Sequence, residues 1–314
     1  MVRFLLRRLV VLAATLLAAS VLTFLVPYLR GGDTARTIMQ ARTGDQAVDP
    51  AQVAELRAEL GLDRPLPVQY LQWLGRAVRG DFGYSFTSRT PVGELLGSAL
   101  QVSFSLALAA LTIAVLAAVP LGSLAAARRG KKLDNGITVL TQSLVAVPEY
   151  WLGPLAVLVF ALRLHWLPSA GWRTPASIVL PASVLALRPM AYFTRVTRAA
   201  MVDVLAAPYI TAARSRGLSY PRTLVRHGLR NSMLPVMSLF SLWFAGLLGG
   251  SIVVEVIFAV PGMGRLIYQA VVNNDVPIVQ GGILSIVALS VLLTTLTDLL
   301  YAVLNPAVRV SGDG

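Results

Sequence analysis

Long apolar runs recur along this chain and limit what it can fold into. Each run is about twenty residues long, the length that an α-helix needs to cross a hydrocarbon core of ~30 Å. Six spans are predicted, at about 8–29, 99–127, 137–163, 176–199, 234–258 and 280–304. Hydrophobic residues make up 56% of the 314 and charged residues only 13%, too few to cover a soluble protein of this size. We therefore expect an all-α, polytopic membrane protein with about six transmembrane helices.

Basic residues gather in short segments beside these spans, as the positive-inside rule describes for cytoplasmic loops. The net charge of +12 is explained in this way and does not require a nucleic-acid partner. With six spans all the basic segments fall on one side, so both termini are predicted to be cytoplasmic. These segments hold Arg3, Arg7, Arg8, Arg128, Arg129, Lys131, Lys132 and Arg309, with further arginines between Arg195 and Arg230.

The spans divide the chain into four parts. Residues 1–30 are expected to form the cytoplasmic N-terminus and a first transmembrane helix, because the apolar run is too long for a cleaved secretory signal. Residues 31–97 are expected outside, with a short helix at Pro50–Leu60 and an amphipathic stretch in "YLQWLGRAVRG" suited to the membrane surface. Residues 98–308 are the five-helix core, with a loop at about 200–234, and 309–314 a cytoplasmic tail.

The segment "YITAARSRGLSYPRTLVRHGLRNSMLP", Tyr209 to Pro235, lies between the fourth and fifth spans and contains no acidic residue. Ala206–Arg216 consists mostly of helix formers, and Gly217 is expected to end that helix. Ser219 and Pro221 suit the start of a second helix. Its arginines alone are explained by topology and by binding of anionic membrane lipid. That explanation does not account for a short helix stopped by glycine.

"TAARSRG", Thr211–Gly217, followed by Leu234-Pro235 resembles the cytoplasmic EAA loop of ABC-importer permeases. The chain is most similar to the B-type permease subunit of dipeptide and oligopeptide importers, although Thr211 stands where the wider family has a glutamate. Five further segments resemble that family's motifs in the same order: "GDFGYSF" (80–86), "WLPSAG" (166–171), "GGSIVVEVIFAVPGMGRL" (249–266), "DVPIVQG" (275–281) and "DLLYAVLNP" (298–306).

The resemblance implies a type I ABC importer-like subunit in a bacterial cell membrane, importing peptides by alternating access. Its partners would be a second homologous permease, two ATPase subunits or domains and an extracytoplasmic binding protein. Dipeptides, oligopeptides, glutathione, nickel chelates and haem all remain open as cargo. The EAA loop would supply a helix that docks on the ATPase, with the coupling residues Tyr209, Thr211, Ala212, Ala213, Arg214 and Gly217.

This chain is not expected to be an enzyme by itself. It has no G-x-x-x-x-G-K-[ST] motif for ATP phosphates, since "RRGKKL" lacks the first glycine and the final hydroxyl residue. ATP and magnesium would therefore bind to the partner ATPases, and no cofactor or metal is expected here. An absence of cysteine excludes disulfides and thiolate metal sites.

Charged residues inside the predicted spans are candidates for the translocation path. Glu149 and Arg188 each lie twelve residues into adjacent spans, at a depth of ~18 Å, and are expected to face each other. They would form either a fixed structural pair or two contacts for the charged ends of a peptide. Glu255, near the outer end of the fifth span, would be an interfacial carboxylate or a contact at the outer gate. A self-sufficient secondary transporter using Glu149 and Arg188 as an ion relay is the alternative, but the inverted repeats typical of that class are not found.

Overall fold

The computed structural model describes residues 2–29, 33–43, 48–59 and 61–304. Within these ranges the chain is helical, without a β-strand, and a single isolated bridge joins Tyr84 to Pro91. The predicted all-α class is confirmed. The expected cytoplasmic tail, 309–314, and its Arg309 lie outside the described residues.

The elements form two compact units, which are described separately. The first unit combines Met1–Ser103 with Pro261–Gly314, and the second is Phe104–Val260. The long helix α5 (Val92–Ala127) begins in the first unit and ends in the second.

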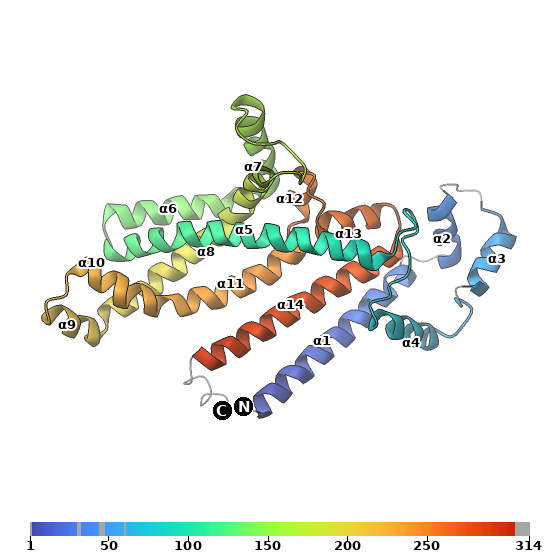
Figure 1. Cartoon of the computed structure of the whole chain (residues 1–314), viewed down its shortest axis with the longest axis horizontal. Coiled ribbons are helices and arrows are strands. Elements are labelled where there is room, and N and C mark those ends of the chain that lie inside the picture. The colour runs from blue at the N-terminus through green and yellow to red at the C-terminus, as the bar shows by residue number, and fades with distance from the viewer. Residues whose placement is uncertain (1, 30–32, 44–47, 60, 305–314) are drawn as a thin grey trace. The chain divides into compact units, whose positions relative to one another are not determined.

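In the first unit α1 (Val2–Leu29) packs against α14 (Val276–Leu304), and the two run side by side in Figure 1. Three short helices follow α1, and a fourth precedes α14: α2 (Thr34–Thr43), α3 (Pro50–Glu59), α4 (Leu66–Ala77) and α13 (Met263–Val272). The short helix expected from Pro50 and the amphipathic stretch in α4 are thus both present, and α2 was not predicted.

Aromatic side chains hold α4 on the end of α1. The ring of Phe24 lies 5.5 Å from that of Tyr70 and 5.9 Å from that of Trp73. The Tyr28 hydroxyl donates a hydrogen bond of 2.5 Å to Gln69. Because α4 places its aromatic residues at i and i+3, one face meets α1. The residues Leu71 and Val78 remain exposed.

In the second unit α6 (Lys132–Ala146) and α11 (Arg230–Gly250) both pack against α8 (Val179–Ala206), next to the later part of α5 (Figure 1). The remaining elements are short: α7 (Glu149–Ala156), the π-helix η1 (Val157–Arg163), the 3-10 helix η2 (Pro175–Ile178), α9 (Pro208–Ser215), α10 (Tyr220–Thr223), the π-helix η3 (Leu224–Leu229) and α12 (Ile252–Ile257).

Five helices of the described residues are long and apolar enough to cross a membrane, and a bent pair brings the number to six. The expectation of about six transmembrane helices is confirmed in this sense. The bent pair is α6 with α7 and η1, whose axes differ by 96°.

Two predicted span boundaries need correction. The third span is not one straight helix over 137–163, because Val147 is extended (φ −85°, ψ 123°) and α7 starts anew after Pro148. A residue that precedes proline is sterically pushed out of the helical region. The fifth span ends at Gly250 and not at 258: Ser251 (φ −81°, ψ 5°) separates it from α12. Two consecutive glycines, Gly249 and Gly250, weaken the helix at that point.

Candidate coupling surface and translocation path

The predicted coupling helix is present as α9. Pro208 occupies its first turn, where a missing N–H has no cost, and Ala207 before it is extended. At the other end Gly217 has φ +90° and its N–H bonds the carbonyl of Arg214 at 2.9 Å. This left-handed residue stops the helix, as the sequence predicted.

One face of α9 is exposed and the other packs on the permease. Tyr209 (45% exposed), Thr211, Ala212 and Arg214 are on the exposed side. Ala213 is only 2% exposed and Ile210 3%. Ile210 and Ala213 are three residues apart and therefore share one face of α9, the face that packs on the permease. The expectation that Ala213 faces a partner is therefore wrong for this structure.

The second helix of the loop is not a separate element. α10 starts at Tyr220, directly after Ser219, and the helical run then continues through η3 and α11 to Gly250. The guanidinium of Arg214 lies 5.7 Å from the centre of the Tyr220 ring, and this contact links α9 to the start of the run. The turn at Gly217 is thus closed by a cation–π contact.

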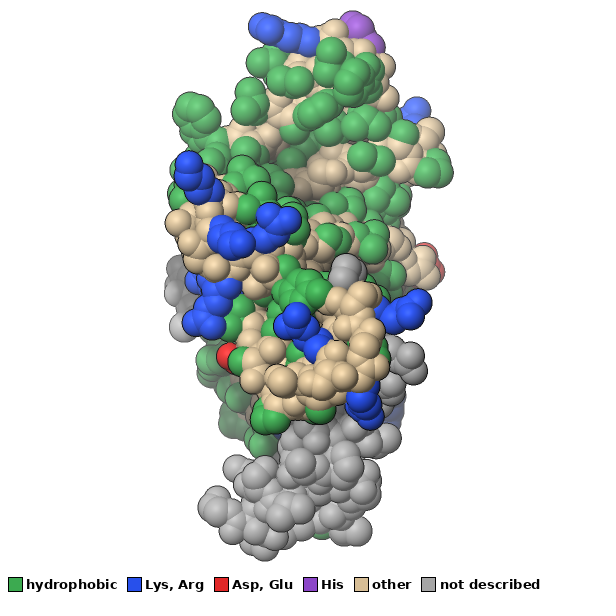
Figure 2. Space-filling view, turned by 90° about the vertical axis from the view of Figure 1, so that its left-hand side faces the viewer, with side chains coloured by type: hydrophobic (Ala, Val, Ile, Leu, Met, Phe, Trp, Pro, Cys, Tyr) green, Lys and Arg blue, Asp and Glu red, His purple; other side chains and the backbone are tan. Residues whose placement is uncertain are grey.

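Basic side chains spread over the end of the second unit that carries α9, and acidic side chains are sparse there (Figure 2). The exposed basic residues of this region come from the α5–α6 turn and from the loop around α9: Arg128, Arg129, Lys131, Lys132, Arg214, Arg216 and Arg222. This surface is the one that the positive-inside rule assigns to the cytoplasm.

An ion pair that the sequence did not reveal lies just below this surface. Asp134, 2% exposed, accepts bonds from Arg198 Nε at 2.5 Å and Arg198 Nη2 at 2.7 Å, and from the Gly130 N–H at 2.9 Å. The fork geometry is the strong form of the arginine–carboxylate pair. It ties the start of α6 to α8, ten residues before α9 begins. The only sequence signal was one acid in the basic run "RRGKKLDNG".

Glu149 and Arg188 are close but do not form an ion pair. Arg188 interacts electrostatically with Glu149, yet no nitrogen–oxygen distance between these two residues is within 4 Å. Glu149 is half-buried in the first turn of α7, where a carboxylate complements the free N–H groups of the helix. The depth expected from a straight third span no longer applies to Glu149, because the chain turns at Pro148. Arg188 is exposed on the continuous helix α8.

Glu255 is not at a surface. It is fully buried in α12 and accepts a bond of 2.6 Å from the Ser251 hydroxyl. The expectation of an interfacial carboxylate is wrong here, because the chain turns at Ser251 and directs α12 into the second unit. A contact of Glu255 with an external partner would require this burial to be undone.

A buried carboxylate organises the loop before α5 in the first unit. Asp275, 0% exposed, accepts bonds from the hydroxyls of Ser85 (2.5 Å) and Thr87 (2.7 Å) and from the N–H groups of Phe86 and Thr87 (both 3.2 Å). The segments "GDFGYSF" and "DVPIVQG" that suggested the family are thus in direct contact. Their contact was not predicted.

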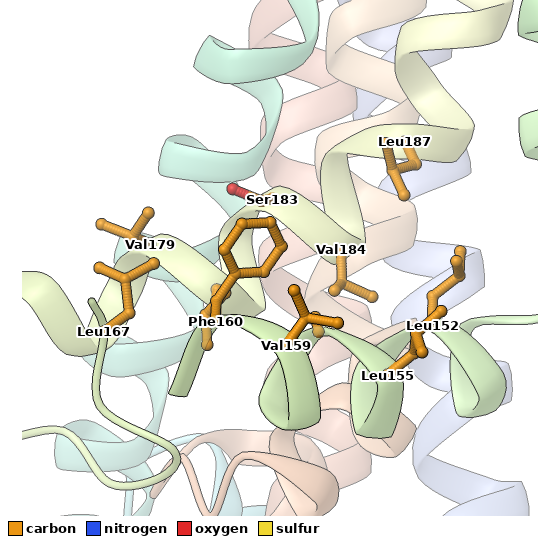
Figure 3. Close-up of a pocket in the computed structure, with 11 residues that line it drawn as sticks. Leu152, Leu155, Val159, Phe160, Leu167, Val179, Ser183, Val184 and Leu187 are labelled. Carbon is orange, nitrogen blue, oxygen red and sulfur yellow. The ribbon is translucent and has the colours of Figure 1, made fainter. Parts of the chain in front are cut away.

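An apolar cavity of about 460 Å³ lies between α7–η1 and α8 (Figure 3). Ser183 contributes the single side-chain oxygen to a lining that is otherwise formed by Leu152, Leu155, Ala156, Val159, Phe160, Leu167, Val179, Leu180, Val184 and Leu187. Such a lining provides no partner for the charged ends of a peptide, so the cavity by itself is not a site for them.

Helices able to span a membrane, with a short half-exposed helix on a basic surface, are the arrangement that the resemblance to ABC-importer permeases predicts. Residues 118–310 match the family described as binding-protein-dependent transport system inner membrane component, and residues 1–107 match its N-terminal companion. The chain belongs to this family of ABC-importer permeases. Membership does not favour the self-sufficient secondary transporter considered above.

Relatives match the chain over almost its full length. A Brucella abortus protein named as a candidate peptide transport system permease is 39% identical over 317 residues, covering 98% of this chain and 99% of that protein. The glutathione transport system permease of Escherichia coli K12 is 39% identical over 310 residues, with the same coverage. The MetNI methionine ABC transporter has the same fold at 17% identity, with a TM-score of 0.55 over 67% of this chain and 96% of that one.

Proposed function

We propose that this permease forms, with a second homologous permease, the path by which a peptide or a peptide-like solute such as glutathione enters the cell. Support for the cargo comes from relatives that are 39% identical and named for peptide and glutathione transport. Support for the coupling comes from one observation above all: α9 exposes Tyr209, Thr211 and Ala212 and is stopped by Gly217 at φ +90°.

The energy for transport would come from partners. Two ATPase subunits or domains would bind ATP and magnesium, and this chain would have no ATPase site of its own. Closure of the ATPases would move α9, and α8 would carry the motion into the membrane. A binding protein would deliver the cargo outside, and the path would open alternately to each side.

The basic surface around α9 would face the cytoplasm, with both termini on the same side. Residues 31–97, including the loop held by Asp275, would lie outside. The positive-inside rule supports this orientation, because the segment around α9 is the most basic of the connections.

A cross-linking experiment tests the coupling role. In a chain without cysteine, Ala212→Cys should form a disulfide with a cysteine placed in the docking groove of the co-expressed ATPase. Ala213→Cys, one residue away but buried, is the matched control and should react poorly. The assembled complex should also restore growth of a peptide-auxotrophic, transport-deficient strain on defined peptides. Equal reaction of both cysteines, or none with a complex that transports, would contradict the proposed docking face.

A further inference from the structure

One face of α8 leaves two arginines and a tyrosine exposed. Arg188, Tyr192 and Arg195 are exposed at spacings of four and three residues, while most of the helix around them is buried. This spacing places the three side chains in one row along the helix. We call these three residues the α8 stripe.

Arg188 lies well inside an apolar span, and Arg195 lies closer to the end of α8 that leads to α9. Arg188 is nine residues from Val179, or about 14 Å along the helix, and Arg195 lies about 10 Å further. An isolated guanidinium facing acyl chains at such a depth is strongly disfavoured, so charged residues inside spans face water-filled cavities or polar partners. The exposed stripe therefore faces a polar space and not lipid.

Neither arginine of the stripe has an acidic partner in contact. In the described part of the chain no carboxylate is within 4 Å of Arg188 or Arg195, whereas Arg198, three residues on, is fully paired with Asp134. Glu149 acts on Arg188 only from a distance. The guanidinium groups of Arg188 and Arg195 can thus bind an anion from outside the chain. The next arginine along the helix, Arg198, is already paired with a carboxylate.

Aromatic rings support the inner arginine. The Arg195 guanidinium lies 5.3 Å from the centre of the Tyr192 ring, and that ring lies 5.3 Å from the ring of Trp243 on α11, tilted by 49°. When a guanidinium stacks on an aromatic ring, its N–H groups, which lie in the guanidinium plane, remain free to donate hydrogen bonds. Two of these N–H groups can bond both oxygens of one carboxylate. The stack therefore orients Arg195 without using its hydrogen-bond donors.

We propose that the α8 stripe binds the terminal carboxylate of the cargo, first at Arg188 and then at Arg195 on the inward side. This inference rests on the proposed function of the chain as a peptide permease. The carboxylate would leave Arg188 and bind Arg195, about 10 Å further along α8. On the way it would pass the Tyr192 ring, which lies between the two arginines. The stripe thereby selects cargo with a free acid at its end.

Uptake of matched peptides tests the selection. A peptide with a free C-terminal carboxylate and the same peptide as its C-terminal amide are each supplied to the reconstituted complex with saturating binding protein. We expect Arg188→Gln and Arg195→Gln to lower transport of the acid by about ten- to a hundredfold, the factor for loss of a hydrogen-bonded charged group. Transport of the amide should be unchanged. Arg188→Lys should retain part of the activity with the acid, because its charge persists.

The binding protein is the same in every assay, so a change in the acid-to-amide ratio belongs to the permease. Arg173→Gln, an exposed arginine outside α8, is the matched control and should leave the ratio unchanged. A second measurement uses Tyr192→Cys, which should react faster with a peptide bearing a thiol-reactive group beside its C-terminus than with one bearing it at its N-terminus. Leu187→Cys, in the apolar cavity, should show no such preference.

Three results would overturn the proposal. The first is an unchanged acid-to-amide ratio in both glutamine variants. The second is a loss of complex assembly in these variants with no change of the ratio, which would assign the stripe to an acidic partner on the second permease. The third is equal labelling of Tyr192→Cys by both peptides. Failure of the parent complex to transport any peptide would instead reject the proposed function itself.

Discussion

Substitution of Asp134 and substitution of Arg198, the two members of the ion pair, are predicted to lower the free energy of unfolding by different amounts. Asp134 is 2% exposed, whereas the side chain of Arg198 is 34% exposed. Removal of one partner from a buried pair leaves the other charge without compensation, and the cost depends on whether water can reach it. The two single substitutions should therefore differ.

Arg198→Gln leaves the carboxylate buried with only the Gly130 N–H as a strong donor. We expect a loss of ~3–5 kcal/mol in the free energy of unfolding, the usual value for a broken buried pair. Asp134→Asn leaves a guanidinium that can turn to water, so its cost should be about 2 kcal/mol, near that of a hydrogen bond to a charged group. The double substitution should cost less than the sum, by about 2 kcal/mol.

Denaturation of the purified permease in mixed micelles, followed by helical circular dichroism, measures these three free energies. Asp203→Asn serves as a control, because this aspartate is exposed on the same helix α8 and should change the free energy of unfolding little. A larger loss for Asp134→Asn than for Arg198→Gln would refute the reasoning from burial. Strict additivity in the double variant would show that the two side chains do not interact.

Three further predictions follow from the loops. Gly217→Val should reduce transport per folded complex, because a β-branched residue tolerates φ +90° poorly; Gly171→Val, at φ +96° and equally open, should introduce similar strain without affecting coupling. Thr43→Cys should react with an impermeant thiol reagent in intact cells and Ser219→Cys only after permeabilisation, and labelling of the latter in intact cells would reverse the orientation. Asp275→Asn should lower the melting temperature of the complex and expose the 80–91 loop to protease, because an amide cannot accept all four hydrogen bonds; unchanged protease resistance would count against that anchor.

Local signals were sufficient for much of the fold. The apolar runs predicted the long helices, since span length follows from bilayer thickness. The turn after α9 was predicted because a left-handed residue there favours glycine, and Gly217 has that conformation. The shape of the third span was missed. Pro148 pushes Val147 into an extended conformation and the chain bends by 96° there, which the unbroken apolar run over 137–163 did not indicate.

Contacts between distant segments were beyond local reasoning. Asp134 and Arg198 are 64 residues apart, and Asp275 lies 190 residues from Ser85. No periodicity relates such pairs, and their partners are decided by how the helices pack. The same limit explains Ala213 and Glu255: their residue types suited an exposed role, but the packing of α9 and the turn at Ser251 bury them.

α8 is the element that joins the coupling helix to the proposed path. It is continuous from Val179 to Ala206, and α9 begins two residues later. A Cβ atom on Gly122 of α5 would lie 2.6 Å from the carbonyl oxygen of Thr194, so the two backbones touch without room for a side chain. Arg198, four residues further along α8, is paired with Asp134 of α6, so α8 is fixed to both α5 and α6 near the end that leads to α9. If α9 is displaced, we expect α5, α6 and the Arg195 end of the α8 stripe to move with α8, because they are joined close to α9.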